Sequence, residues 1–414
     1  MILGRIEPRA PLTIIGGGIA GLLLARAQLR HGGSVRLLER GSRLGGLLET
    51  RNTPYGPAEA AAHSLLATPA VLDLCRELGI ELIEARTRTR YIVRGQKLRR
   101  LPAPALTPAE LAAAVWRAAT VRAHLPREAT LEDWARAHLG EAALNWALDP
   151  FTHGIYGVPP RELSLDAAFP RLRTDESALL PHLWRNRRRG ARAPAMVAPR
   201  EGVGALARAL EAELRGHPRC EVRLGEQVTT LPSDGAVALC VPAPQAAALL
   251  AAAGERALAA ALARLRYVAL TSVTAFVRGA AGDPPGVGAL FPSSERRAGQ
   301  PLGVLFNSSA FEGRVSSSDF SSFTLIFRSE DTAGAAISAL VERSLSFLLK
   351  REVSLLHHMA FSHAEAVPIY DSRVRDVWAI AGERFNARPG LALFGNYTGQ
   401  VSLRGMIEAC QDLR

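Results

Sequence analysis

Short apolar runs alternate with longer segments of helical periodicity along most of the chain. An apolar run at 11–15 leads through three consecutive glycines into a helical pattern that ends at Arg30, and a second run at 34–38 follows. Short apolar runs bounded by turn residues predict buried strands, whereas apolar residues at every third or fourth position predict helices. Strands that alternate with helices in this way predict an α/β protein built on a parallel sheet.

The same pattern predicts most of the remaining elements. Helices are expected at 69–78, 107–149, 204–214, 245–265, 332–350 and 403–413, and strands at 220–224, from Val228 onward, at 236–243, several times within 267–328 and near 355. A hairpin is expected at 90–102, with its turn at Gly95. Residues 1–10 are expected to form a loose tail, and the Gly- and Pro-rich stretch 150–165 is expected to be a loop.

The glycines after the first strand have the spacing of a dinucleotide-binding turn. Gly16 permits a tight turn, Gly18 lets backbone N–H groups approach the phosphates, and Gly21 lets the helix pack closely against the strand. The N-terminus of that helix offers unpaired N–H donors and a partial positive charge to the pyrophosphate. An acid at the end of the second strand can accept the ribose hydroxyls. The cofactor-binding residues expected here are Gly16, Gly18, Ile19, Ala20, Gly21, Glu39 and Arg40.

Two further Gly-rich turns indicate which dinucleotide is bound. Arg43 and the pair Gly45 and Gly46 follow the second strand, and the turn 395–402 precedes the last predicted helix. This arrangement resembles flavoprotein oxidases of the amine oxidase class, in which an Arg-x-Gly-Gly turn contacts the FAD pyrophosphate and a C-terminal turn places a helix end against the flavin ring. The resemblance implies FAD as cofactor, with the segment 55–64 passing beneath the flavin. It implies further cofactor contacts from Arg43, Gly45, Gly46, Ala61, Val228, Gly395, Asn396, Val401 and Ser402, the last also available as a helix cap.

These motifs divide the chain into five segments. Residues 11–85, 201–262 and 366–414 are expected to form a Rossmann-like FAD-binding domain, 263–365 the mixed sheet of a substrate domain, and 86–200 a substrate or helical insertion that could contact a membrane. The fold class is therefore α/β, or α+β overall, and amine oxidase-like.

Composition narrows the functional classes. The 414 residues are 48% hydrophobic and 21% charged, as expected of a folded globular protein. Four cysteines without C-x-x-C spacing suit a reducing cytosol and argue against a disulfide framework or a metal site. The formal charge is +11, but no aromatic-interleaved basic motif accompanies it, so no nucleic-acid partner is expected.

The sequence favours a cytoplasmic protein and leaves a peripheral contact with the inner face of the cell membrane open. The Ala- and Leu-rich tract 245–265 contains Glu255, Arg256 and Arg264, so it predicts a helix of a globular protein rather than a membrane span. The Arg-rich run 185–192 is expected to be a solvated loop, with a contact to anionic lipid or an acidic partner as the alternative. Both a monomer and a homodimer remain open.

Four stretches of the chain resemble oxygen-dependent protoporphyrinogen oxidases. They are 150–165 with its Pro-Phe, Gly, aromatic and Glu-Leu-Ser, the segment 286–314, the Ala-x-Pro-x-Tyr segment 366–370, and the C-terminal turn 395–402. The resemblance covers nearly the whole chain. It implies an FAD-dependent, six-electron oxidation of a porphyrinogen to a porphyrin in tetrapyrrole biosynthesis, with dioxygen reoxidising the flavin and forming hydrogen peroxide.

The same resemblance implies roles for six residues. Arg90 corresponds to an arginine that anchors a substrate propionate, which needs the bidentate geometry of guanidinium. Gly154 corresponds to a glycine whose backbone lies beside the reacting carbon. The catalytic candidates are Arg90, Gly154 and Tyr156, and the substrate-binding candidates are Arg90, Gly154, Val287, Leu290 and Ile326. The expected mechanism is hydride transfer to flavin N5, promoted by proximity and a dry apolar slot rather than by a side-chain base, with His153 in a structural role.

Three departures from the family pattern keep other functions open. Ala61 and Gln400 stand where the family usually has glycine, and Arg328–Ser329 stands where a Gly-Gly pair is expected. The resemblance implies protoporphyrinogen IX as the substrate, and these departures leave coproporphyrinogen III or another apolar compound as alternatives. A flavin amine oxidase or desaturase, and a non-catalytic flavin- or porphyrin-holding protein, are the competing readings. Against the amine oxidase, Lys350 lies in a predicted helix rather than on the substrate sheet.

Overall fold

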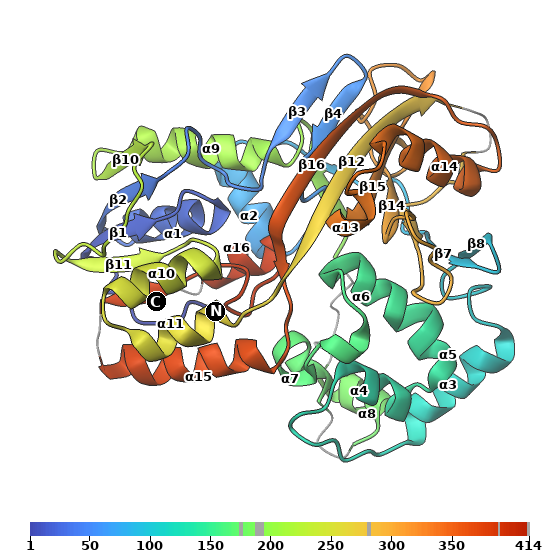
Figure 1. Ribbon diagram of the computed structural model, residues 1–414, viewed down its shortest axis with the longest axis horizontal. Coiled ribbons are helices and arrows are strands. Elements are labelled where there is room, and N and C mark those ends of the chain that lie inside the picture. The colour runs from blue at the N-terminus through green and yellow to red at the C-terminus, as the bar shows by residue number, and fades with distance from the viewer. Residues whose placement is uncertain (174–176, 187–193, 280–282, 388–389, 412–414) are drawn as a thin grey trace.

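A computed structural model, which describes residues 1–173, 177–186, 194–279, 283–387 and 390–411, shows two large sheets side by side (Figure 1). The first sheet has five strands, all parallel, in the order β10-β2-β1-β11-β17. Its strands are β1 (Pro11–Ile15), β2 (Ser34–Glu39), β10 (Cys220–Leu224), β11 (Ala236–Leu239) and β17 (Leu391–Leu393). The sheet thus joins the start, the middle and the end of the chain.

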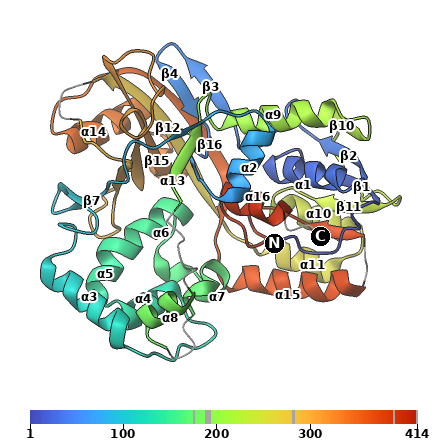
Figure 2. The same ribbon diagram turned by 180° about the vertical axis from the view of Figure 1, so that it is seen from behind.

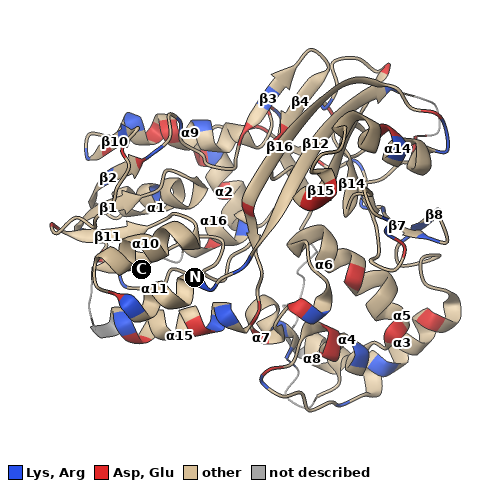
Figure 3. Ribbon diagram, in the orientation of Figure 1, with Lys and Arg blue, Asp and Glu red and all other residues tan. Residues whose placement is uncertain are grey.

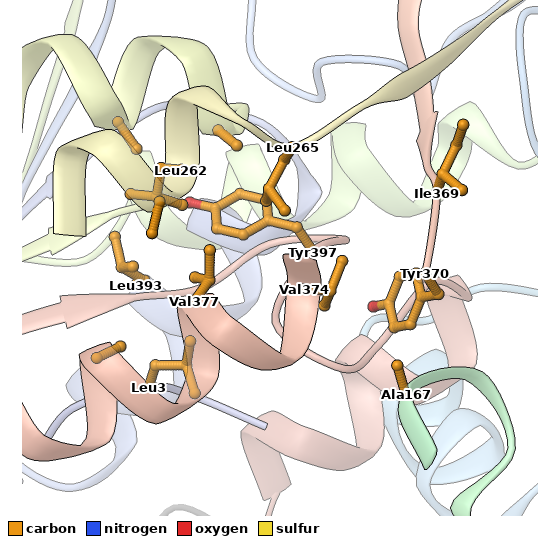
Figure 4. Close-up of a cluster of buried hydrophobic side chains, with 14 of the residues drawn as sticks. Leu3, Ala167, Leu262, Leu265, Ile369, Tyr370, Val374, Val377, Leu393 and Tyr397 are labelled. Atoms are coloured by element: carbon orange, nitrogen blue, oxygen red, sulfur yellow. The ribbon is translucent and has the colours of Figure 1, made fainter. Parts of the chain in front are cut away.

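Helices cover both faces of the first sheet, which makes a three-layer α/β/α unit. One face carries α1 (Ile19–Arg30), α2 (Pro69–Glu77), α9 (Gly204–Arg215) and α16 (Leu403–Gln411). The other carries α10 (Ala243–Ala252), α11 (Arg256–Ala263) and α15 (Ser372–Ala387). Successive residues of a strand point to opposite faces of the sheet. Ile14 accordingly packs in a first buried cluster with α1, α2, α9 and α16, and Ile15 packs in a second buried cluster with α10, α11 and α15. Figure 4 shows part of the second cluster, where Leu262, Val377 and Leu393 surround Tyr397.

The second sheet has seven strands in the order β16-β12-β15-β14-β13-β7-β8, with one parallel pair, β13 and β7. Its strands are β7 (Arg90–Arg94), β8 (Lys97–Arg100), β12 (Tyr267–Arg278), β13 (Gly288–Leu290), β14 (Gly303–Phe306), β15 (Phe320–Arg328) and β16 (Leu355–Pro368). The long strands β12 and β16 run diagonally from the far end of this sheet toward the first one (Figure 1). Two smaller sheets stand beside them, β3 (Thr50–Thr53) with β4 (Gly56–Glu59), and β5 (Leu65–Leu66) with β9 (Met196–Pro199) and β6 (Leu82–Glu84).

The two faces of the second sheet differ in chemistry. One face packs beneath α14 (Ile337–Leu349) through a cluster that includes Val273, Leu325 and Phe327. Because side chains alternate along a strand, Ile326 and Leu290 lie on the opposite face. Charged residues gather on α9 and α15, whereas the ribbon of β12 is almost free of them (Figure 3). We call the face that carries Ile326 and Leu290 the open face of the second sheet.

A group of helices lies beside the second sheet and also reaches α15 of the first unit (Figure 2). It comprises α3 (Pro108–Thr120), α4 (Leu131–His138), α5 (Glu141–Ala143), a π-helical turn (Leu144–Leu148), α6 (Asp149–Tyr156), α7 (Leu165–Ala168) and α8 (Leu179–Asn186). Capping boxes begin two of these helices, Thr107 with Glu110 at α3 and Thr130 with Asp133 at α4. In the described part of the chain, no helix is long and apolar enough to cross a membrane.

The structure corrects four predictions about local structure. The stretch from Asp149 to Tyr156 is a helix rather than a loop, because Pro150 sits in the first turn, where no N–H partner is needed, and Gly157 ends the helix at φ 71°. Residues 1–10 are not a loose tail, since Leu3 is buried and pairs with Leu393. The predicted helix 245–265 is two helices, broken near Gly254 at φ 82°. No strand begins at Val228, which instead packs against the core of the first sheet.

Candidate active site

The turn between β1 and α1 has the shape that the glycine spacing predicts. Gly16 has φ 108°, and a Cβ there would lie 2.6 Å from the carbonyl oxygen of Cys240. A Cβ on Gly21 would lie 2.0 Å from the carbonyl oxygen of Gly16, so this helix cannot approach the strand so closely with any side chain at that position. Ile19 and Ala20 form the first turn of α1, where backbone N–H groups have no intrahelical partner.

A second glycine turn, which contains Gly45 and Gly46, packs directly against the first one. The N–H of Gly45 donates to the carbonyl of Gly17 at 2.8 Å. Gly46 has φ 58°, and a Cβ on it would meet the Cα of Gly18 at 3.0 Å. On the Gly18 side, the nearest atom to an added Cβ would be the Cα of Gly46, at 4.0 Å. Two turns of bare backbone at the uncapped N-terminus of a helix fit the pyrophosphate of a dinucleotide.

The acid at the end of β2 lies beside this cradle. One carboxylate oxygen of Glu39 accepts the N–H of Gly17 and the other accepts the N–H of Gly41, each at 2.7 Å. Arg43 donates to the carbonyl of Gly46 at 2.7 Å and to Glu49 at 2.8 Å, so it holds the second turn together. Arg40 is exposed. Glu39 can therefore reach a ribose, whereas Arg43 supports the turn that the phosphates would approach.

Aromatic side chains hold the C-terminal turn in place. The Tyr370 hydroxyl donates to the Asn396 carbonyl at 2.6 Å and accepts the N–H of Gly399 at 3.0 Å. The indole of Trp378 donates to the carbonyl of Tyr397 at 2.9 Å. The Ser402 hydroxyl accepts the N–H of Gly405 at 3.1 Å, so it caps α16 as predicted.

Gln400 and Val401 of this turn contact different parts of the protein, the start of α16 and a small pocket. The Oε1 atom of Gln400 is 2.0 Å from where a Cβ on Gly405 would lie, so this side chain covers the first turn of α16. Val401 and Gly399 line a pocket of about 200 Å³ together with Tyr156, Tyr370 and Trp378. That volume is below the range of about 300–1,000 Å³ typical of ligand pockets, so this pocket is too small to enclose a whole ligand of that kind.

The segment that contains Ala61 lies between the two sheets. The carbonyl of Ala60 contacts the Nε2 atom of His363 on β16 at 3.0 Å, and its N–H donates to the carbonyl of Glu49 at 2.9 Å. Nearby, the Nε2 atom of His63 is buried and has no hydrogen-bond partner among the described residues. Burial lowers the pKa of His63 to about 3, so this imidazole is neutral near pH 7. An orphaned polar atom at this junction is compatible with a bound group that the chain itself does not supply.

Sequence reasoning missed a buried ion pair next to this segment. Glu59 accepts the Thr50 hydroxyl at 2.6 Å and the N–H of Val203 at 2.9 Å, and Arg314 lies 3.8 Å away. Burial raises the pKa of Glu59 and lowers that of Arg314, because each charged form loses hydration. The hydrogen bond from Val203 to Glu59 joins β4 to the start of α9. The acid after Gly56-Pro57 and the arginine after Gly313 were visible in the sequence, but nothing there indicates that they meet.

Helix α6 brings two predicted site residues together at the open face of the second sheet. A Cβ on Gly154 would lie 2.5 Å from the Cδ2 atom of Leu290, so the leucine fills the space beside the bare backbone. Ile326 lies on the same face of the sheet, on β15. Leu290 thus lies against α6, and Ile326 lies on the same face two strands away, opposite Gly303 of β14.

The other predicted substrate residues lie farther along the sheet or beside it. Arg90 is exposed and is level with Gly288, on the same face as Leu290 by alternation. Val287 is buried one residue before β13, where alternation turns it toward the opposite face. Tyr156 is buried against Phe169 and Tyr370, with ring centroids 5.6 and 6.1 Å away. Burial raises the pKa of Tyr156 to about 12, so its hydroxyl stays protonated.

A polar cluster holds the first turn of α6. The carboxylate of Asp149 accepts the N–H and the hydroxyl of Ser293 at 2.7 and 2.8 Å. The Nδ1 atom of His153 lies 3.0 Å from the carbonyl and 3.2 Å from the carboxylate of Asp149. His153 is therefore occupied by its own helix, which suits a structural role.

The fold and the two joined glycine turns define a dinucleotide-binding flavoenzyme. Residues 19–252 match the family model for flavin containing amine oxidoreductases, which is more than half of the chain. The chain belongs to this family of FAD-binding oxidoreductases, and the residues described above fit that cofactor.

Named relatives are similar at low identity. Over 357 residues, 72% of this chain and 73% of the relative, the chain is 28% identical to the protoporphyrinogen oxidase of Bos taurus. Over 188 residues it is 34% identical to the coproporphyrinogen III oxidase of Propionibacterium freudenreichii subsp. freudenreichii, which covers 40% of this chain and only 35% of that relative. A crystal structure from Exiguobacterium sp. 255-15, provisionally described as a protoporphyrinogen oxidase, superposes over 98% of both chains with a TM-score of 0.79 at 19% identity, which shows a shared fold.

Proposed function

We propose that the chain oxidises protoporphyrinogen IX to protoporphyrin IX. Six protons and six electrons leave each macrocycle, and three molecules of dioxygen take them up as three molecules of hydrogen peroxide. Bound FAD supplies the two-electron acceptor that links the two half-reactions. The observation that carries the proposal is the contact between Gly154 and Leu290, because bare helix backbone opposite an apolar side chain can open into a slot for a large apolar ring.

The residues of the slot act by position and by exclusion of water. Gly154 leaves room for a macrocycle carbon to approach the cofactor, and Leu290 and Ile326 supply an apolar wall. Arg90, exposed on the same face, offers a guanidinium to a propionate carboxylate. Because His153 is hydrogen-bonded to Asp149, we assign no side-chain base to the slot. The names of the relatives support a porphyrinogen, and the choice between two porphyrinogens is left to the experiment.

The test is porphyrin fluorescence after mixing the FAD-loaded protein with freshly reduced protoporphyrinogen IX in air, with coproporphyrinogen III in a parallel cuvette. The proposal predicts that fluorescence rises well above autoxidation with protoporphyrinogen IX, and that one hydrogen peroxide forms per two hydrogens removed. A faster rise with coproporphyrinogen III would shift the substrate to the earlier porphyrinogen. No rise with either compound would refute porphyrinogen oxidation.

The helical group also supports a peripheral contact with an anionic membrane. Trp116 on α3 and Trp184 on α8 are 64% and 78% exposed, and Val115 beside them is 52% exposed. The charged side chains of α3 turn inward instead, since Glu110 binds Arg94 and Arg117 donates to carbonyls of α4. Exposed tryptophans on an uncharged helix face favour the boundary between lipid headgroups and acyl chains.

Vesicle binding tests this contact. The protein should float with vesicles that contain anionic lipid, its tryptophan emission should shift to the blue, and both effects should weaken at least severalfold in the double variant Trp116→Gln, Trp184→Gln. Oxidase activity toward soluble substrate should persist in that variant. Equal flotation of the variant would contradict the contact. Most of the Arg-rich run 185–192 lies outside the described residues, since these exclude 187–193.

A further inference from the structure

Helix α6 is joined to the second sheet at both of its ends. At its start, the carboxylate of Asp149 accepts two hydrogen bonds from Ser293, which follows β13. At its end, the guanidinium of Arg328 donates to the carbonyl of Gly157 at 2.9 Å. Arg328 is the last residue of β15, and Gly157 caps α6 in the left-handed conformation.

Between these two ends, α6 meets the sheet through apolar packing. Leu290 lies against Gly154, and its Cδ2 atom would also meet a Cβ on Gly303 at 2.9 Å. A leucine side chain seated against two glycines can rotate away without breaking a hydrogen bond. Apolar packing of this kind does not fix the distance between α6 and the sheet, because the hydrophobic effect is non-directional. The height of α6 above the sheet is therefore set at its ends.

The positive charge of Arg328 complements the partial negative charge at the C-terminal end of α6. The last carbonyl groups of a helix have no intrahelical partners and carry a partial negative charge. A guanidinium that donates to one of them gains from both the hydrogen bond and the helix dipole. The Arg328 side chain is 26% exposed, and its Nη1 atom lies 3.3 Å from Glu330, which is itself 73% exposed. Gly157 is thus the more shielded of the two partners.

We propose that Arg328, together with the Asp149–Ser293 pair, positions α6 and thereby sets the width of the substrate slot. The identity of the substrate in this inference rests on the proposed function, but the positioning does not. A helix fixed at both ends, with one mobile leucine beneath its centre, admits a macrocycle of limited thickness when Leu290 rotates and excludes a thicker ligand. Arg328 is then a positioning residue and a determinant of specificity, although it touches no reacting atom.

The decisive variants are Arg328→Gln and Arg328→Lys, with Arg343→Gln as the matched control. Arg343 is an exposed arginine on the opposite side of the sheet that donates to a carbonyl of its own helix. Hydrogen exchange of the α6 amides in the FAD-loaded protein measures how firmly this helix is held, and it needs no substrate. We expect faster exchange of the last turn of α6 in Arg328→Gln, partial recovery in Arg328→Lys, and no change in Arg343→Gln.

Steady-state kinetics with the porphyrinogen give the second readout. A displaced α6 lowers kcat by about tenfold or more with KM within about twofold, because small displacements of a reacting geometry are costly. A higher KM with unchanged kcat and unchanged exchange would mean that Arg328 binds the substrate carboxylate, and would overturn the positioning role. If the wild type oxidises no porphyrinogen but Arg328→Gln still exchanges faster at α6, the positioning role stands and the proposed function is refuted. If Arg328→Gln fails to fold, Ser293→Ala tests the other end of α6 by the same readouts.

Discussion

Replacing Gly154 by alanine separates the stability of α6 from the openness of the slot. Alanine in a helix interior is more stable than glycine by about 0.5–1 kcal/mol. The new Cβ would lie 2.5 Å from the Cδ2 atom of Leu290, so the leucine or the helix must move. Turning a leucine off its rotamer costs about 0.5–1.5 kcal/mol. The two terms nearly cancel, and the free energy of unfolding should change by less than about 1 kcal/mol.

Activity should respond far more than stability. A methyl group in the slot, or a shift of about 1 Å in α6, should lower kcat/KM toward the porphyrinogen by about 10- to 100-fold. Gly382→Ala on α15 is the control, because a Cβ there meets no atom within 4 Å. Adding Leu290→Ala to Gly154→Ala should restore part of the lost activity through a favourable coupling. Wild-type activity of Gly154→Ala, or additive losses in the double variant, would refute a slot bordered by these two residues.

Two further predictions concern the cofactor turn and pH. Gly21→Ala should weaken FAD binding at least tenfold in a fluorescence titration, because its Cβ would lie 2.0 Å from a backbone oxygen, whereas Gly382→Ala should bind normally; equal binding by both would contradict the cradle. His63 has its pKa lowered to about 3, so as pH falls below 6.5 the unfolded chain takes up a proton that the folded chain does not, and stability falls. In urea unfolding, the free energy of unfolding of the wild type should fall between pH 7 and pH 5 by up to about 2 kcal/mol more than that of His63→Asn. An equal fall in both proteins would exclude His63 as a source of acid sensitivity.

The cofactor side of the molecule could be predicted from the sequence because its constraints are local. Gly16 and Gly21 lie within one turn and helix, and their roles follow from backbone geometry alone. The acid after β2 lies at a fixed distance along the same unit. The parallel first sheet follows from the same alternation of strands and helices. These features needed no knowledge of distant contacts.

The substrate side depends on contacts between distant segments, which the sequence does not encode locally. The glycine and proline content of 150–165 suggested a loop, yet Pro150 and Gly157 mark the two ends of α6. Arg328 was visible only as a departure from a Gly-Gly pair, and its contact with Gly157 spans 171 residues. The pairing of Glu59 with Arg314 is equally non-local.

The most direct test of porphyrinogen oxidation is anaerobic mixing of the oxidised, FAD-loaded protein with protoporphyrinogen IX in a stopped-flow spectrometer. The proposal predicts that the visible absorbance of oxidised flavin disappears rapidly on anaerobic mixing, because one FAD takes up two of the six electrons. When dioxygen is admitted, the flavin absorbance should return and porphyrin absorbance should grow. A primary amine in a parallel experiment should leave the flavin oxidised. A flavin that stays oxidised with the porphyrinogen but is bleached by the amine would contradict the proposed function and assign the chain to amine oxidation.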